Sequence, residues 1–440
     1  MSNMKIEVLS KELIKPSIPT PTHLRDFKLS FIDERIPTSY MPLILYYKFG
    51  VDKDIKQSEM CRRLKNSLSE ALVRFYPLAG RMHGQASVKC NDDGILYIEA
   101  KAEGKNISDI VKSMDSRDLD RLVPFESNGC VSGAEEQLAV QVTLFTCGGL
   151  AIGICLSHRI ADICTLDSFI KCWVALASSE ARGHPISPVF NSATLFPPRN
   201  TPDFRPNFRS PAVQPMRSAK PVMRRFVFTP KAINALKLLA TEGSSANEKP
   251  TRVEVLTAFL WSRCLAAKRI IGGKPVRSVA YHPINLRGRI PELTENSFGN
   301  IFQMTRAENE GETDWVRLVE KVRAAFKKID SKYVRKLQEE RGFELAKENF
   351  MEISKLLLLG DVEIFRFSSY SRFGFYEADF GWGRPVWVSS AGYLGKDTIL
   401  LIDSLQWTGG IEAWVVMAKQ DMERLQQDLE IQLLTSSFVS

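Results

Sequence analysis

The stretch 138–162 reads LAVQVTLFTCGGLAIGICLSHRIAD, and it does most to define the fold. Its two apolar runs, residues 138–145 and 150–157, are joined through a Gly-Gly turn and predict a β-hairpin. An apolar stripe of helical period follows at about 165–178 and predicts a helix. Strand, loop and helix together would hold His158 and Asp162 at the end of a buried strand, where a rigid scaffold can present them to a ligand.

Outside this stretch, segments of period two alternate with segments of period 3.6, so the chain is of the mixed α/β class. The remaining predicted elements are helices at about 58–75, 230–241, from Thr251 onward and within 312–358, strands at 223–229 and 276–285, and three strands within 385–418. A final amphipathic helix is predicted from the spacing of Met422, Leu425, Leu429 and Leu433.

One long segment, Leu195 to Pro221, lacks any periodicity. It contains seven prolines, at positions 197, 198, 202, 206, 211, 215 and 221. Proline at this density predicts an extended crossover linker. The sequence therefore predicts an N-terminal domain over 1–194, a linker over 195–221 and a C-terminal domain over 222–440.

Composition excludes several classes of protein. Of 440 residues, 44% are hydrophobic and 25% are charged, which excludes a disordered, collagen-like or rod-like chain. The net charge is +8, but the sequence contains no run of basic residues, so no nucleic-acid partner is expected. The positive charge still favours binding of a small polyanion. With no secretory signal and no apolar run of membrane-spanning length, a cytoplasmic protein without membrane insertion is expected.

Most familiar catalytic motifs are absent. The eight cysteines include no C-x-x-C pair and are expected to be buried thiols in a reducing compartment. There is no G-x-S-x-G, H-E-x-x-H, Walker A or G-x-G-x-x-G sequence, so no metal, ATP or NAD site is predicted. Histidine is the side chain best suited to proton transfer near neutral pH, which makes His158 the leading candidate base. Its spacing to Asp162 also occurs by chance, and a core histidine bonded to the backbone is the alternative.

A second motif, Asp379-Phe380-Gly381-Trp382-Gly383, lies near the C-terminus. By itself it is compatible with a simple turn before a strand. Paired with His158-x-x-x-Asp162, it resembles the signature of the plant BAHD acyltransferases, and the resemblance extends over nearly the whole chain. Agreement continues in the segments YPLAGR at 76–81, NLRGR at 285–289 and GN at 299–300. Within that family the chain is most similar to the alkaloid acetyltransferases.

The resemblance implies two similar-sized chloramphenicol-acetyltransferase-like domains with an active-site channel at their interface. It implies a monomer that uses acyl-CoA, with acetyl-CoA favoured, to acylate a hydroxyl on a plant specialised metabolite such as an indole alkaloid. His158 matches the family's general base. Asp162 matches a carboxylate that pairs with an arginine and supports the site, and Arg287 or Arg289 is the candidate partner.

Two further assignments stay open at this stage. Trp382 matches a residue near the developing oxyanion, although Asp379, Gly381 and Gly383 would also suit a purely structural turn. Thr251 and Arg252 suit a helix N-terminus that binds a CoA phosphate, although an ordinary capped helix explains them equally well. The alternatives to O-acetylation are a non-catalytic ligand-binding homologue, an amine acceptor, or a benzoyl, malonyl or hydroxycinnamoyl donor.

Overall fold

The computed structural model describes residues 4–48, 57–125, 135–146, 148–178, 184–199, 221–242, 249–268, 277–312, 314–359, 362–391 and 395–436. The chain forms two compact units, each assembled from separate stretches of sequence. Unit 1 comprises Met1–Arg205, Pro291–Ile301 and Phe373–Tyr393, and unit 2 comprises Pro206–Ile290, Phe302–Arg372 and Leu394–Ser440.

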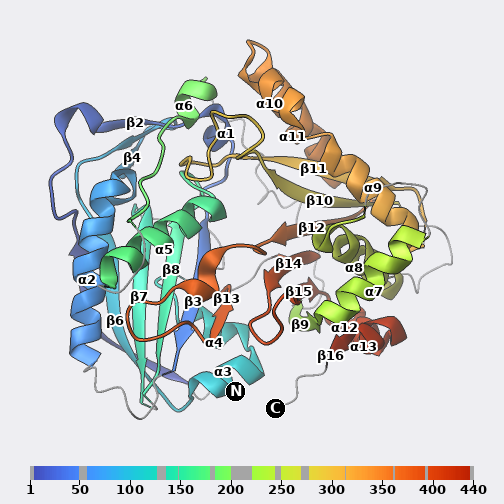
Figure 1. The fold of residues 1–440 in the computed structure, drawn as a ribbon, viewed down its shortest axis with the longest axis horizontal. Helices are drawn as coiled ribbons and strands as arrows, with labels where there is room; N and C mark the ends of the chain where they lie inside the picture. The colour runs from blue at the N-terminus through green and yellow to red at the C-terminus, as the bar shows by residue number, and fades with distance from the viewer. Residues whose placement is uncertain are drawn as a thin grey trace. The chain divides into compact units, whose positions relative to one another are not determined.

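Unit 1 is built on a six-stranded mixed sheet with the order β1-β6-β7-β8-β3-β13 (Figure 1). The strands are β1 (Lys5–Ile14), β3 (Tyr40–Tyr47), β6 (Ile95–Glu103), β7 (Leu138–Phe145), β8 (Leu150–Ser157) and β13 (Trp387–Ser389). β7 and β8 form the antiparallel hairpin that the apolar runs predict. Every residue of β8 is buried, which explains why this strand is a continuous apolar run.

Two helices, α2 (Gln57–Arg74) and α5 (Ile163–Ala177), lie side by side over one face of this sheet (Figure 1). The indole nitrogen of Trp173 on α5 donates to the Leu64 carbonyl and the Ser67 hydroxyl of α2, each at 3.1 Å. The remaining elements of unit 1 are short: β2 (Asp26–Lys28), β4 (Arg81–His83), β5 (Ser87–Lys89), α1 (Phe31–Glu34), α3 (Ile107–Ser113), α4 (Ser116–Asp120), α6 (Ser192–Leu195), η1 (Thr22–Leu24), η2 (Tyr76–Ala79) and η3 (Gly374–Glu377).

Unit 2 is built on a seven-stranded sheet with the order β11-β10-β12-β14-β15-β9-β16. The strands are β9 (Val222–Phe228), β10 (Ser278–Asn285), β11 (Phe302–Asn309), β12 (Glu363–Ser369), β14 (Thr398–Asp403), β15 (Ile411–Met417) and β16 (Thr435–Ser436). The helices are α7 (Pro230–Glu242), α8 (Arg252–Lys268), α9 (Trp315–Lys327), α10 (Ser331–Gln338), α11 (Gly342–Leu359), α12 (Lys419–Gln427) and α13 (Leu429–Leu434). α8 is buried almost all round, between the sheet and the helices α7, α9 and α12.

The prediction of one continuous C-terminal helix is wrong. The helix ends at Gln427, and Asp428 begins a new one by accepting hydrogen bonds from the backbone N–H groups of Glu430 and Ile431. The change of direction leaves Leu429 73% and Leu433 83% exposed, whereas Met422 and Leu425 are buried as expected.

The two units differ from the sequence-based domain boundaries. Residues 291–301 and 373–393, which the sequence placed in the C-terminal domain, belong to unit 1. The physical reason is strand pairing, because β13 extends the unit 1 sheet next to β3. Most of the expected linker, residues 200–220, lies outside the described residues.

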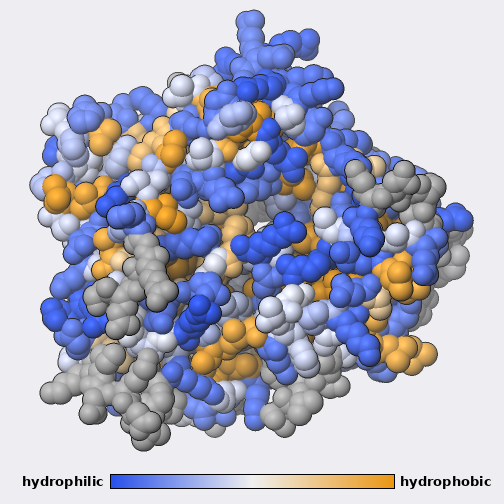
Figure 2. All heavy atoms as spheres, in the orientation of Figure 1, coloured by the Kyte–Doolittle hydropathy of each residue, from blue (hydrophilic) through white to orange (hydrophobic). Residues whose placement is uncertain are grey.

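Within the described ranges, no helix is both long and apolar enough to cross a lipid bilayer. On the face drawn in Figure 2, hydrophobic side chains form separate small patches among hydrophilic ones. Of the cysteines in the described part of the chain, Cys164 is partly exposed and the other five are buried.

Candidate active site

His158 directly follows β8, and its backbone N–H donates to the Ser39 carbonyl at 2.8 Å. In the side chain, Nδ1 lies 3.2 Å from the Ala161 carbonyl oxygen. A carbonyl can only accept, so Nδ1 carries the hydrogen and Nε2 carries the lone pair in the neutral ring. Burial lowers the pKa of His158, and the Ala161 carbonyl and the Asp162 charge only partly oppose this effect. The imidazole is therefore neutral near pH 7 and fitted to accept a proton at Nε2.

Arg159 holds the loop that carries His158 in place. It is buried, and its guanidinium donates to the Asp33 carbonyl at 2.8 Å, to the Ile36 carbonyl at 3.3 Å and to the Gln85 carbonyl. A buried guanidinium bonded to three carbonyls ties the loop to two distant segments of unit 1, residues 33–36 and Gln85. Arg159, the second residue of the H-x-x-x-D motif, therefore has a structural role that the spacing of His158 and Asp162 does not reveal.

Asp162 is a buried N-cap residue of α5. One carboxylate oxygen accepts from the Thr165 backbone N–H at 3.0 Å, and the other accepts from the Ile301 backbone N–H at 3.0 Å. The first bond fixes where the helix begins, and the second attaches it to the segment before β11. Asp162 therefore has clear structural contacts, in line with its predicted supporting role.

Asn300 and Asp33 complete the support of His158, and the sequence reasoning assigned neither of them a role. The Asn300 side-chain amide donates to the His158 carbonyl at 2.8 Å and to Asp33 Oδ1 at 2.9 Å. Asp33 Oδ1 also accepts from the Asn300 backbone N–H at 2.7 Å. Burial raises the pKa of Asp33 to about 6, although hydrogen bonds from Ser30 and Asn300 oppose it. The pairing of positions so distant in sequence could not be read from local pattern.

The motif 379–383 forms a tight turn. Asp379 Oδ1 accepts from the backbone N–H groups of Gly381 and Gly383, each at 2.8 Å. Both glycines have positive φ, 102° and 116°, which confirms the unusual backbone angles predicted for them. A Cβ on Gly381 would lie 2.4 Å from the end of the flexible Arg63 side chain, which can move, so the positive φ is the stronger reason for glycine at this position.

Strand register separates Trp382 from His158 within unit 1. The Trp382 ring packs edge-on against Tyr47, with ring centroids 6.2 Å apart. Tyr47 pairs with Leu150 at one end of β8, whereas Tyr40 pairs with Ser157 at the other end, next to His158. Seven residues of strand span about 23 Å. In addition, β13 runs antiparallel to β3, so the residues before Trp387 extend beyond the Tyr47 end.

Trp382 is 2% exposed and stacks on Phe380 at 5.6 Å. Its indole N–H has no hydrogen-bond partner among the described residues. The position of Trp382 argues against the oxyanion role that the sequence left open, because a donor to the oxyanion must reach the atom that His158 also serves.

The remaining predicted site residues belong to unit 2. Thr251 is an N-cap residue as expected, because its hydroxyl accepts from the Glu254 N–H at 3.2 Å and its N–H donates to the Glu254 carboxylate at 2.6 Å. Thr251, Arg252 and Arg289 line one cavity of about 300 Å³. Arg252 donates to Asp403 at 3.3 Å and to the Gly409 carbonyl at 2.9 Å.

The two candidate partners of Asp162 have different surroundings in unit 2. Arg287 is 8% exposed, and its guanidinium donates to the Asn285 side chain at 3.3 Å. The Arg289 guanidinium donates to the Asn285 carbonyl at 2.8 Å and to the Ile329 carbonyl. The pairing of Asp162 with either arginine stays a prediction.

Comparison with known proteins shows which family the chain belongs to. The family model described as "Transferase family" matches residues 4–432. Stemmadenine O-acetyltransferase of Catharanthus roseus is 34% identical over 99% of both chains. A limonoid 1-O-acetyltransferase of Citrus sinensis is 37% identical over 97% of both chains.

Vinorine synthase of Rauvolfia serpentina is 33% identical over 99% of both chains. Its crystal structure superposes with a TM-score of 0.80 and covers 98% of this chain and 99% of its own. Such likeness over the full length, together with the H-x-x-x-D and D-F-G-W-G residues, shows that the chain belongs to the Transferase family, that of the plant BAHD acyltransferases, and that it is an acyl-CoA-dependent acyltransferase.

Proposed function

We propose that the enzyme transfers an acetyl group from acetyl-CoA to a hydroxyl of a small plant specialised metabolite, with His158 as general base. The observation that carries this proposal is the fixed orientation of the His158 ring. The bond from Nδ1 to the Ala161 carbonyl directs the lone pair to Nε2, and the lowered pKa keeps the ring neutral near pH 7, so Nε2 is available to accept a proton. The named activities of relatives, acetylation of stemmadenine and of a limonoid, support acetyl as the donor group.

The reaction proceeds by direct transfer while both substrates are bound. Nε2 of His158 takes the proton as the acceptor oxygen attacks the thioester carbonyl carbon. The tetrahedral adduct then expels the CoA thiolate, which receives that proton from the imidazolium. The products are the acetyl ester and CoA thiol, and His158 returns to its neutral form. General-base catalysis of this kind supplies about 10²–10⁴-fold, and positioning supplies the rest.

Asp162 is assigned a supporting role in this proposal, with Arg287 as its partner. Its two carboxylate oxygens already accept the N–H groups of Thr165 and Ile301, so it holds backbone in place. Arg287 is favoured over Arg289 because the Arg289 guanidinium is bonded to two backbone carbonyls. Trp382, with Asp379, Gly381 and Gly383, is assigned to the structural turn.

CoA phosphate is proposed to bind at the cavity lined by Thr251 and Arg252. Arg289 and Arg372 line the same cavity, so three guanidinium groups accompany the N-terminus of α8. Asp403, which accepts from Arg252 and from the Arg372 N–H, sets the arginines in place. Arg252→Ala is expected to raise the KM for acetyl-CoA about tenfold at unchanged kcat. Arg317→Ala, on an exposed arginine of α9, is the matched control.

A thiol-release assay tests the chemistry. Acetyl-CoA is offered with panels of alkaloid and limonoid alcohols, with amines, and with malonyl-, benzoyl- and hydroxycinnamoyl-CoA in place of acetyl-CoA. His158→Ala is expected to lower turnover by about 10²-fold or more and to leave CoA binding, measured by calorimetry, intact. His83→Ala, an exposed histidine, is the control. Full turnover in His158→Ala would overturn the assignment of the base. Binding without any thiol release in the wild type would favour the non-catalytic alternative.

A further inference from the structure

The loop between β14 and β15, residues 404–410, is tied at both ends to arginines of the proposed CoA cavity. Asp403, the last residue of β14, accepts from the Arg252 guanidinium at 3.3 Å and from the Arg372 N–H at 2.6 Å. Near the other end of the loop, the Gly409 carbonyl accepts from Arg252 at 2.9 Å. Arg252 and Arg372 both line the cavity, and all these residues belong to unit 2, so the loop adjoins the cavity.

Trp407, at the middle of this loop, presents an open aromatic ring. Of the seven tryptophans, all within the described ranges, Trp407 is 41% exposed and the other six are at most 8% exposed. The Gly410 N–H donates to the Trp407 carbonyl at 2.7 Å, and the Ser404 N–H donates to the Gly410 carbonyl at 3.1 Å, so the loop is a bonded turn. Two residues of chain span at most about 7 Å, which places the Trp407 backbone within that distance of Gly409.

The chemistry of coenzyme A places a flat base beside its phosphates. One ribose carries the adenine, the 3′-phosphate and the 5′-diphosphate. Phosphates held by the guanidinium groups of the cavity therefore bring the adenine to its surroundings. Stacking of a base on an aromatic side chain is favourable and needs no hydrogen bond to the base edges. Trp407, exposed and close to Arg252, has the surface and the place that such stacking requires.

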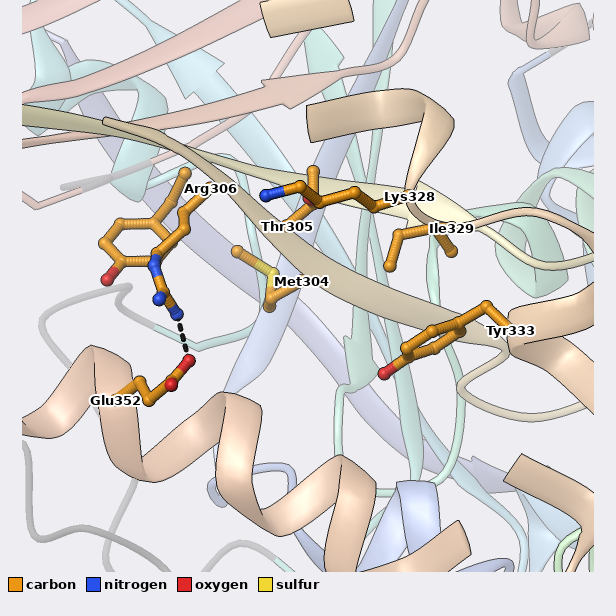
Figure 3. A pocket seen from close by; sticks show the side chains of 8 residues that line it. Met304, Thr305, Arg306, Lys328, Ile329, Tyr333 and Glu352 are labelled. Carbon is orange, nitrogen blue, oxygen red and sulfur yellow. Dashed lines mark hydrogen bonds and ion pairs between the residues drawn. The ribbon is translucent and has the colours of Figure 1, made fainter. Parts of the chain in front are cut away.

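A further cavity of unit 2, of about 330 Å³, is less favourable for a nucleotide (Figure 3). Its lining includes Arg306, which donates to Glu308 at 2.6 Å and also to Glu352, the bond marked by the dashed line in Figure 3. These two carboxylates offset the guanidinium and would repel a phosphate. Among the described residues that line the CoA cavity there are three arginines and no carboxylate, and Asp403, which bonds two of these arginines, offsets only one of the three charges.

We propose that Trp407 is a specificity-determining residue for the acyl donor, whose indole ring stacks on the adenine base of CoA while the neighbouring arginines bind its phosphates. The proposal rests on the acetyltransferase function argued above and on CoA binding at the cavity of Thr251 and Arg252. Trp407 makes the enzyme prefer thioesters of the complete nucleotide to thioesters of 4′-phosphopantetheine alone, the form that acyl carrier proteins present. The selection acts on binding of the donor and not on the chemical step.

The test compares CoA with 4′-phosphopantetheine, which lacks the whole adenosine part, by calorimetry on the full chain. Trp407→Ala is expected to weaken CoA binding about tenfold, the effect of one lost stacking contact. The affinity for 4′-phosphopantetheine should stay as in the wild type. Leu405→Ala is the matched control and should leave CoA binding unchanged, because Leu405 is 46% exposed on the same loop but has no aromatic ring.

Two further measurements separate stacking from other roles of this residue. Trp407→Phe keeps an aromatic face, so its CoA affinity should stay within about threefold of the wild type. Trp407→Ala should weaken binding of 3′-dephospho-CoA by the same factor as binding of CoA, because both carry the base. Unchanged CoA affinity in Trp407→Ala, an equal loss of affinity for 4′-phosphopantetheine, or no recovery in Trp407→Phe would each overturn the stacking role.

Thiol release from acetyl-CoA is measured on the same samples. If the wild type acetylates an acceptor and Trp407→Ala binds CoA as the wild type does, the stacking role fails and the acetyltransferase function stands. If CoA affinity depends on Trp407 as expected but no hydroxylated acceptor releases thiol, the proposed function fails, and Trp407 stays part of a CoA-binding site.

Discussion

At the scale of single residues, the proposed catalytic base, His158, is defined by its hydrogen bonds more than by its position in the sequence. Ala161 fixes the tautomer of His158, Arg159 anchors the loop, and Asn300 holds the His158 carbonyl. Asp33 in turn orients Asn300 through two hydrogen bonds. The proton transfer proposed for Nε2 thus depends on groups that orient His158 without accepting the proton themselves.

The raised pKa of Asp33 predicts that mild acid increases the stability of the fold and lowers the activity. Its pKa is raised to about 6 in the folded protein, so the native state binds this proton more tightly than the unfolded chain does. The protonated form stabilises the fold below that pH, and this contribution is lost as pH rises through about 6. Relative to Asp33→Asn, the wild type should gain about 1 kcal/mol of unfolding free energy between pH 7 and pH 5.

Activity should fall over the same interval, because a neutral Asp33 holds Asn300 less firmly. Denaturant titrations at several pH values, with matched kcat/KM profiles, provide the measurement. A wild-type-to-variant stability difference that stays constant from pH 7 to pH 5 would contradict the role given to Asp33.

Trp382 provides the second residue-scale prediction. Because it lies near Tyr47 and away from the Ser157 end of β8, Trp382→Phe should lower stability by about 1–3 kcal/mol and leave kcat within about threefold. Thermal unfolding and steady-state kinetics on the same preparation separate the two effects. A fall of kcat by about 10²-fold at unchanged melting temperature would restore the oxyanion role.

At the scale of elements, the start of α5 and the segment 297–301 form one interlocked structure. Asp162 caps the helix and binds the Ile301 N–H. Thr165, on the first turn, exchanges two hydrogen bonds of 3.2 Å with the Gly299 backbone. The helix that follows the base is thereby held by a segment that lies more than a hundred residues further along the chain.

Two substitutions of Asp162 separate its contacts. Asp162→Asn keeps a good N-cap but replaces the acceptor for the Ile301 N–H with a donor, and should lower stability by about 1–3 kcal/mol. Asp162→Ala also removes the cap and should cost about 1 kcal/mol more. Activity should fall with stability in both variants, as chemical denaturation and thiol-release kinetics would measure.

Asn106→Ala is the control for capping alone, because Asn106 caps α3 through the Asp109 N–H at 2.9 Å, outside the proposed CoA cavity. It should lower stability without lowering activity. An inactive Asp162→Asn enzyme with full stability would instead indicate that Asp162 and His158 act as a catalytic dyad.

At the scale of the whole molecule, neither unit is a continuous piece of chain. Unit 1 takes β13 and the segment with Asn300 from the second half of the sequence. A fragment that ends at residue 205 therefore lacks an edge strand and the groups that hold His158 and Asp162.

The fragment 1–205 expressed alone should be unstable and inactive, whereas co-expression with 206–440 should restore activity. Circular dichroism, thermal unfolding and thiol release on the separate and combined fragments give the measurement. Acetyl transfer by the isolated first fragment would mean that the groups held in 291–301 and 373–393 are dispensable.

The sequence by itself predicted the α/β class, the β7–β8 hairpin, the helix α5, the capped start of α8 and the acyltransferase family. Each of these depends on local information. Short apolar runs joined by a Gly-Gly turn define the hairpin, apolar residues at helical spacing define a helix, and Thr251 with Glu254 forms a capping box. The motif residues are likewise consecutive or four apart.

Only the tertiary structure decided which distant residues meet. Asp33, Asn300 and His158 lie far apart in sequence, and their hydrogen bonds exist because the sheet and its crossing segments bring them together. The same holds for Trp382, whose motif suggested chemistry although register carries it to the Tyr47 end of β3. Local pattern records what each residue prefers for its own backbone and side chain, whereas a contact between distant residues depends on how every strand between them is paired.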